Sequence, residues 1–269
     1  MATAATTMNL APTRSGRNIA VIYWKETKYE FLKSFRLRAY TLSTLGFPVM
    51  FYILFGLVMG RQSIDGINVS KYLIATYGTF GVMGASLFGT TGALAAERGL
   101  GWLQVKRASP MPPFAYFAAK IIKSMVFSLI VVLLLFFLGM TFGGVSMSVA
   151  DTAKLTGILV LGSLPFCVMG LALGYFLGPN SAPAVINMIY LPLSFCSGLW
   201  IPFIFLPRII QQIAHLLPSY HLAQLGLGVF GAGQSESSWS HWRLLIGFSL
   251  ICLGVARLGF QRDEGKTYG

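Results

Sequence analysis

Two glycine-containing runs in this chain are spaced like loops that bind nucleotide phosphates. Residues 226–231 read Gly-Leu-Gly-Val-Phe-Gly, but no strand precedes this run and no β-α-β unit surrounds it. Residues 265–267 read Gly-Lys-Thr, but Phe260 stands where a phosphate-binding loop has its first glycine, and only two residues follow the run. We therefore predict that this chain holds no nucleotide of its own.

The residue types that enzymes use are scattered along the chain. His215 and His221 fall in a loop-rich stretch, and we interpret them as structural residues rather than metal ligands. All three cysteines, at positions 167, 196 and 252, lie in apolar stretches and are expected to pack there, without a disulfide or a metal. An intramembrane enzyme would need a nucleophile–base pair or metal ligands at one depth, so we predict no catalytic site, metal or resident cofactor.

A third polar run, at residues 97–110, stands out because apolar stretches flank it. It reads Glu-Arg-Gly-Leu-Gly-Trp-Leu-Gln-Val-Lys-Arg-Ala-Ser-Pro. We expect a short helix from about Gly99 to Ala108, ended by Ser109-Pro110. Glu97 and Arg98 would lie at the membrane edge, where a salt bridge could join this segment to the N-terminal helix. A stiff polar segment of this kind could transmit the motion of another protein, although a plain solvated connector is the alternative.

The rest of the chain is suited to lipid. Hydrophobic residues make up 55% of it and charged residues 10%, against about 25% charged in ordinary soluble domains. A helical span needs about 20 mainly apolar residues, so we predict an all-α membrane protein with six transmembrane helices in one compact domain over residues 19–269. The predicted spans lie near residues 40–60, 72–95, 118–142, 154–178, 182–203 and 243–260.

The basic residues are distributed unevenly between the loops. The net charge is +12, and 15 of the 20 lysines and arginines, Lys120 and Lys123 among them, fall in segments on the same side as the N-terminus. Cytoplasmic loops carry this excess, so we predict both termini in the cytoplasm of a bacterial cell whose inner (plasma) membrane holds the chain. Nucleic-acid binding is not predicted.

The N-terminal region divides in two. Residues 1–18 are rich in Ala and Thr and are expected to be a disordered tail. Residues 19–37 form an expected amphipathic helix on the cytoplasmic interface, or else a solvated helix packed on a soluble partner. Its apolar face would carry Ala20, Trp24, Thr27, Phe31 and Phe35, and the opposite side Lys25, Glu26, Tyr29, Glu30, Lys33 and Arg36.

The predicted spans contain almost no ionisable residue, with none from 41 to 60, 72 to 96, 124 to 150 or 155 to 207. An ion-coupled carrier needs a buried group to hold its ion, and a voltage sensor needs a ladder of arginines. Energy for uphill transport would therefore have to enter from another protein. Before the last span, prolines divide the region 204–230 into pieces too short to cross, which predicts short re-entrant helices; a seventh span is the alternative.

The polar loop and the end of the fifth predicted span resemble those of ABC transporter permeases of the type-2 export class. The loop carries the family's acidic-basic start, glycine, leucine, Ser-Pro and later lysine, and the second region carries Ser-Gly, two prolines and Pro-x-Tyr. Trp102 and Gln104 depart from the residues that are frequent in the family. The matching residues are Glu97, Arg98, Gly101, Leu103, Ser109, Pro110, Lys120, Ser197-Gly198, Pro202, Pro207 and Pro218-Ser219-Tyr220.

This resemblance implies a half-transporter that pairs with a second permease copy, identical or related. Each copy would receive a separate ATP-binding cassette subunit, which would hold ATP and Mg²⁺, on the cytoplasmic coupling loop 97–117. The chain itself would be a non-catalytic transport subunit. The residues expected to couple to the ATPase are Glu97, Arg98, Gly101, Trp102, Leu103, Ser109 and Pro110.

In the family the second and fifth spans line the seam between the two copies, which implies a substrate pathway there. A weakly polar lining without fixed charge suits an amphiphilic or hydrophobic solute such as a drug, antibiotic or lipid. Such hydroxyls also serve simply as helix-packing groups, and a stand-alone channel or carrier remains the alternative function. The expected pathway residues are Thr76, Thr79, Met83, Ser86 and Thr90 on the second span and Asn187, Tyr190, Ser194 and Ser197 on the fifth.

Overall fold

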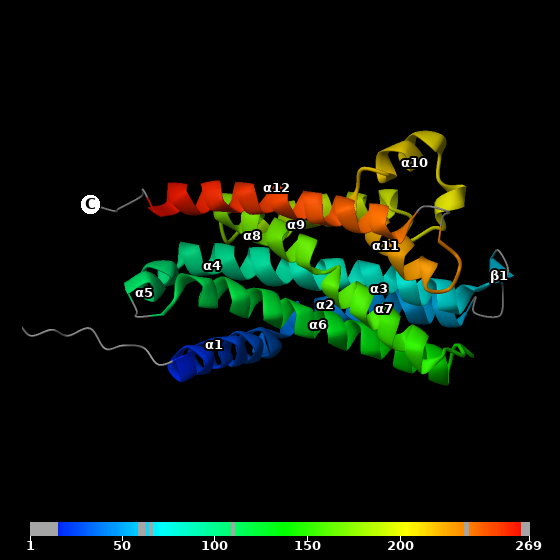
Figure 1. The fold of residues 1–269 in the computed structure, drawn as a ribbon, viewed down its shortest axis with the longest axis horizontal. Coiled ribbons are helices and arrows are strands. Elements are labelled where there is room, and N and C mark those ends of the chain that lie inside the picture. The colour runs from blue at the N-terminus through cyan, green and yellow to red at the C-terminus, as the bar shows by residue number, and fades with distance from the viewer. Residues whose placement is uncertain (1–15, 59–62, 65–66, 109–110, 234–236, 265–269) are drawn as a thin grey trace, which may run out of the picture.

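Helices account for most of the computed structural model, which describes residues 16–58, 63–64, 67–108, 111–233 and 237–264. They lie side by side as an elongated bundle (Figure 1). We call its two ends the α5 end and the α10 end after the short helices there. The elements are α1 (Gly16–Arg36), α2 (Arg38–Phe51), η1 (Tyr52–Leu57), β1 (Ser63–Ile64), β2 (Ile67–Asn68), α3 (Val69–Leu87), η2 (Phe88–Gly92), α4 (Ala93–Gly99), α5 (Trp102–Ala108), α6 (Pro113–Thr141), α7 (Val149–Leu161), α8 (Leu164–Phe176), α9 (Ala182–Cys196), η3 (Phe203–Phe205), α10 (Arg208–Ala214), α11 (Pro218–Gly228) and α12 (Ser238–Glu264).

Local sequence signals explain where several helices begin. The Asn68 side chain accepts a hydrogen bond from the Ser70 amide at 2.8 Å and caps α3, and Ser148 caps α7 in the same way through the Asp151 amide at 3.0 Å. Proline occupies the first turn of α6, α9 and α11, where its missing amide hydrogen costs nothing. The two short strands pair antiparallel as a hairpin before α3.

Among the described residues, five helical segments are long and apolar enough to cross a bilayer. The fifth predicted span, 182–203, differs: α9 has 15 residues and is therefore about 22 Å long, less than the roughly 30 Å of the hydrocarbon core. Gly198, with φ of 74°, turns the chain just beyond it. The five segments are Arg38–Leu57, Val69–Gly99, Phe114–Thr141, Val149–Phe176 and Ser238–Asp263.

The helix α3 lies at the centre of the bundle. It contacts α6, α11, α2 and α8, and nearly all of its side chains are buried. By contrast, α2 and α12 lie at the surface and expose many large apolar side chains, as expected of lipid-facing helices. The core therefore forms around the second predicted span. Lys120 and Lys123, predicted to lie in a cytoplasmic segment, are instead fully buried in α6.

The helix α1 begins at Gly16, three residues before the predicted start, and the remainder of the predicted tail lies outside the described residues. Its predicted faces are only partly correct. Trp24 and Phe35 are exposed, as an interfacial helix requires, but Glu30 is buried on the side that packs against α6. One side of the predicted charged face thus turns toward the protein, because its glutamates have lysine partners there.

Short helices follow α9, as the prolines predict. Pro202 and Pro207 directly precede η3 and α10, and Pro218 begins α11. The helix α10 projects from the bundle (Figure 1), whereas α11 is buried against α3 and α12. The glycine-rich run 226–231 forms the end of α11 and the turn after it, a helical setting unlike a phosphate-binding loop. The other run, 265–267, lies outside the described residues.

Candidate functional site

The α5 end is built around a sharp turn between α4 and α5. Gly101 has φ of 73°, a conformation that L side chains rarely adopt, while the space around it is open. Two residues earlier, a Cβ atom on Gly99 would lie 2.2 Å from Cγ of Pro179, in the turn between α8 and α9. Both glycines are therefore required, one for the turn and one for the close contact.

Glu97 is the centre of the ion-paired cluster just before this turn. Its side chain is 3% exposed. Its Oε1 accepts from Lys33 Nζ of α1 at 2.6 Å, and its Oε2 from Lys120 Nζ at 2.9 Å and from the Tyr116 hydroxyl at 2.5 Å, both on α6. The sequence-predicted salt bridge from this segment to the N-terminal helix is present. One carboxylate thus joins three helices.

A second group of charges joins α5 to α1. Lys106 on α5 pairs with Glu26 and lies 3.6 Å from Glu30, which in turn pairs with Lys120 at 3.2 Å. Burial alone would lower the pKa of Lys106, but the hydrogen bond to Glu26 and the charges of Glu97, Glu30 and Glu26 outweigh it, so the pKa is raised. Lys106 is therefore charged at neutral pH and holds α5 against α1.

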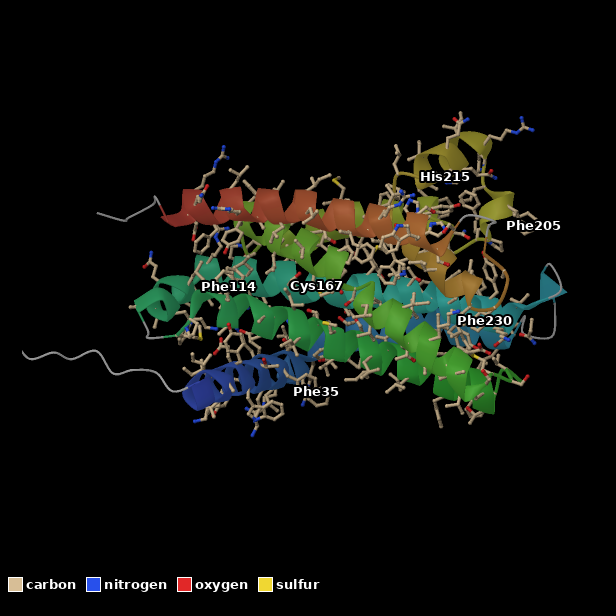
Figure 2. The ribbon with its side chains drawn as sticks, in the orientation of Figure 1. Phe35, Phe114, Cys167, Phe205, His215 and Phe230 are labelled. Carbon is tan, nitrogen blue, oxygen red and sulfur yellow. The ribbon has the colours of Figure 1, made fainter. Side chains whose placement is uncertain are left out.

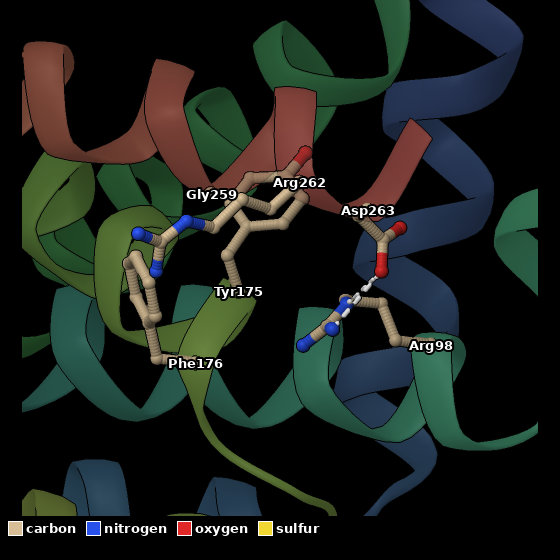
Figure 3. Close-up of a pocket in the computed structure, with 6 residues that line it drawn as sticks. All are labelled: Arg98, Tyr175, Phe176, Gly259, Arg262 and Asp263. Atoms are coloured by element: carbon tan, nitrogen blue, oxygen red, sulfur yellow. Dashed lines mark hydrogen bonds and ion pairs between the residues drawn. The ribbon is translucent and has the colours of Figure 1, made fainter. Parts of the chain in front are cut away.

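Arg98 connects the same turn to the other side of the bundle. Its Nε and Nη2 donate to Asp263 Oδ1 of α12 at 3.1 and 3.0 Å (Figure 3). Its Nη1 donates to the Gly174 carbonyl of α8 at 2.9 Å. Arg98 and Asp263 border a pocket of about 450 Å³ with Tyr175, Phe176, Gly259 and Arg262. Adjacent residues of α4 therefore tie the end of this helix, just before the turn into α5, to α1 and α6 on one side and to α8 and α12 on the other.

The helix α5 also presents an apolar surface outside the bundle. Leu103 is buried with Leu94 and Tyr116 and anchors the helix, but the other apolar residues point outward. Figure 2 shows Phe114 at this end of the molecule. We call these exposed residues the α5 surface: Leu100, Trp102, Val105 and Phe114.

The structure brings most of the predicted coupling residues together. Glu97, Arg98, Gly101, Trp102 and Leu103 lie within one turn–helix unit, while Ser109 and Pro110 lie outside the described residues. Sequence analysis did not foresee the residues that complete the cluster. Glu26 and Glu30, spaced four apart and so on one helix face, were the available signal. The added residues are Glu26, Glu30, Lys106, Tyr116, Lys120 and Asp263.

A long groove runs along the bundle between α2, α3, η2, α4 and α9. Its volume is about 750 Å³. Toward the α10 end its wall is aromatic, with Tyr190 stacked on Phe80 at 4.7 Å between ring centroids and donating to the Phe80 carbonyl at 3.0 Å. The other aromatic residues of the wall are Phe47, Phe51, Phe88 and Trp200.

The residues predicted to line a pathway are placed in two environments. Asn187 and Tyr190 of α9 line the groove. The residues of α3 and η2 are buried within the chain, where the hydroxyls of Thr79, Ser86 and Thr90 donate to backbone carbonyls four residues earlier at 2.7–2.9 Å. Met83 and Thr76 are buried there too, and on the α9 side Ser194 bonds to Trp200 and Ser197 to Ser219. Apart from Asn187 and Tyr190, these side chains contribute to packing in the single chain.

The α10 end contains the three histidines. His221 Nε2 lies 2.8 Å from the His215 carbonyl and donates to it. Its Nδ1 lies 2.7 Å from Nδ1 of His241 on α12, so the two rings share a hydrogen bond. Both rings are buried, and the pair fastens α11 to α12.

Long apolar helices with a lipid-facing surface, and a polar helix held at one end by ion pairs, define an integral membrane protein of the helical transport class. The chain belongs to the ABC-2 type transporter family, whose model matches residues 23–230. It is similar to the protein named "Putative transport permease YvfS" of Bacillus subtilis (strain 168), with 26% identity over 247 residues that cover 89% of this chain and 97% of that protein. The family resemblance seen in the sequence is thus confirmed, and the chain is a transporter membrane subunit.

Proposed function

We propose that this chain is the permease of an ATP-driven exporter and that the α5 surface receives the ATP-binding cassette subunit. The observation that carries this proposal is the attachment of α5. The helix is short, exposes Trp102 and Val105, and is tied to α1 by the ion pair of Lys106 with Glu26. The adjoining α4 is ion-paired to α6 through Glu97 and to α12 through Arg98. A force applied to such a helix reaches most of the bundle, which a plain solvated connector would not achieve.

The proposal places the α5 end in the cytoplasm of a bacterial inner membrane. Most of the basic residues gather at this end, including Lys25, Lys28, Arg36, Arg257 and Arg262, and positive charge favours the cytoplasmic side. The first described residues of α1 and the last of α12 are also at this end (Figure 1). Both termini would then be cytoplasmic, and ATP and Mg²⁺ would be bound by the partner subunit.

The groove is the proposed substrate pathway, completed by a second copy of the permease. The groove, with a volume of about 750 Å³ and an aromatic wall, is large enough for an amphiphilic or hydrophobic compound such as a drug, antibiotic or lipid. On α9, beside the groove, Met188, Leu191 and Phe195 are exposed and could contact the second copy. Contact between the two copies through α9 would close the open side of the groove. It would leave the packing around α3 within each copy unchanged.

The experiment that tests this function is reconstitution in vesicles. The permease is co-expressed with a candidate ATP-binding cassette subunit from the same organism, and the two are purified and incorporated together. We expect a stable complex, and ATP hydrolysis and drug or lipid export that both require the two subunits. Transport by the permease alone would favour the alternative, a stand-alone channel or carrier, and would contradict the proposal.

A further inference from the structure

Lys123 is a buried cation on the wall of the groove. It lies ten residues after Pro113, the start of α6, and therefore about 15 Å into a helix that is long enough to cross the bilayer. The residue is 1% exposed, yet its side chain borders the groove together with Tyr40, Phe88 and Gly89. Ionisable residues at such a depth are costly and usually serve a function.

The contacts of Lys123 leave its charge without a balancing carboxylate. Its Nζ donates to the Gly89 carbonyl in η2 at 2.7 Å and lies 5.6 Å from the centroid of the Tyr40 ring. Among the described residues no carboxylate forms an ion pair with it. An ammonium group has three hydrogens to donate, so two remain beyond the bond to Gly89.

Lys120, one helical turn earlier, shows what the protein does when such a charge is purely structural. That lysine is equally buried, but it pairs with Glu97 at 2.9 Å and with Glu30 at 3.2 Å. Glu30 and Glu97 act on Lys123 only through space, while the positive charge of the neighbouring Lys120 opposes them. The two lysines share a helix and are equally buried, but of the two only Lys120 is in direct ion-pair contact with described carboxylates.

We propose that Lys123 is the binding site for the anionic group, a carboxylate or phosphate, of an amphiphile whose apolar body occupies the aromatic part of the same groove. Burial removes water from the ammonium group, and an anion within hydrogen-bond distance restores the lost stabilisation. Phe47, Phe80 and Trp200 line the same groove and provide apolar contact for the remainder of the ligand. This inference rests on the proposed function of the groove and specifies the charge of its ligand.

A pair of fluorescent probes that differ only in charge tests the site. Dansylaminoundecanoic acid and its methyl ester share the chain and the fluorophore, but only the acid is anionic. The full-length permease in phosphatidylcholine nanodiscs is titrated with each probe. We expect the acid to bind about tenfold more tightly than the ester, as one hydrogen bond to a buried charge provides.

Two substitutions and a matched control locate the effect. Lys123→Met should reduce binding of the acid to the level of the ester, and Lys123→Arg should retain the preference because it keeps the charge. Lys154→Met removes the same charge from an exposed position on α7 near the other end of the bundle and should leave the preference unchanged. Should Lys123→Met fail to insert, the acid-to-ester ratio in the unaltered protein still decides the question.

The origin of the anion is resolved by adding phosphatidylglycerol to the nanodiscs. Competition with the acid would identify a bilayer lipid head group as an occupant, and absence of competition would identify a free amphiphile. Equal binding of acid and ester, or a preference that survives Lys123→Met, would overturn the proposal. ATP-driven export of a neutral solute in that case would leave the permease function intact.

Discussion

The two ends of the bundle are held together by different chemistry. At the α5 end, Glu97, Lys120 and Arg98 form ion pairs that cross between helices. At the α10 end, the contacts are neutral hydrogen bonds, such as Ser197 to Ser219 at 2.6 Å and His221 to His241 at 2.7 Å. Ion pairs tolerate several geometries and can exchange partners, whereas neutral bonds between buried groups need one arrangement. From this contrast we predict that the α5 end moves during transport and that the α10 end stays fixed.

Removing the charge at the centre of the α5 end should have the largest effect. In Glu97→Gln, Lys120 and Lys33 each lose a partner, which costs about 3 kcal/mol of stability when a buried pair is broken. We expect export to fall by more than ATP hydrolysis, measured in the same vesicles. Asp151→Asn, at the start of α7, is the control. If the ratio of export to ATP hydrolysis were the same in both variants, the α5 end would have no special role in coupling.

The next prediction compares two exposed tryptophans. Trp102 on the α5 surface is 55% exposed, and Trp239 on α12 near the other end is 64% exposed. Replacement of either by Ala should change the unfolding temperature little. Trp102→Ala should weaken binding of the ATPase subunit about tenfold, as loss of an aromatic contact residue often does, and Trp239→Ala should not. Binding is measured by titration in detergent, and equal affinities would show that α5 is not the docking site.

A histidine substitution tests the fixed end. His221→Ala removes the hydrogen bond between these two buried rings, which costs about 1 kcal/mol. The unfolding temperature should fall, while the ratio of export to ATP hydrolysis stays at the wild-type value. A changed ratio would show that the α10 end also takes part in coupling.

A matched pair of glycines sharpens the comparison further. Gly101 and Gly231 have φ of 73° and 72°, and neither has an atom near the position of a Cβ. Alanine at each should therefore cost about 1–2 kcal/mol through backbone strain alone. Only Gly101→Ala should also lower the ratio of export to ATP hydrolysis, because it changes the orientation of α5. A similar ratio in the two variants would show that the substitution at Gly101 acts only through stability.

The smallest expected effect is that of pH on the link between α5 and α1. The pKa of Lys106 is raised above its usual 10.5, so its contribution to stability is complete below that value and is lost as the pH rises through the raised pKa. Thermal unfolding of the wild type relative to Lys106→Met should give a difference that is constant from about pH 6 to pH 9 and shrinks in more alkaline solution. A difference that already shrinks on going from pH 6 to pH 9 would contradict this ion pairing.

The sequence predicts the long helices well because uninterrupted apolar stretches need no tertiary information. The fifth predicted span shows where this fails. Residues 182–203 are mainly apolar, but Gly198 adopts a positive φ and Pro202 directly precedes a new element, so the helix stops at Cys196. Both residues were visible as helix-ending signals, and hydropathy outweighed them in the prediction.

The candidate coupling site was predictable as a segment but not as a network. The polar run 97–110 is conspicuous among apolar stretches, which located Glu97 and Gly101. Their partners are far away in sequence: Lys33 lies 64 residues from Glu97, and Asp263 lies 165 residues from Arg98. Spacing along one helix cannot report such pairs. Lys123 was likewise counted among the loop charges. Its burial comes from packing against other helices, which the local sequence does not reveal.

The contact between Gly99 and Pro179 has a mechanical consequence. The last residue of α4 leaves no gap before the turn that leads into α9, since even one added carbon atom would collide with the proline ring. If the end of α4 moves toward the turn between α8 and α9, that turn must move with it. Since α9 forms one side of the groove, a displacement of α5 that pushes α4 against this turn would be transmitted to that side through direct van der Waals contact.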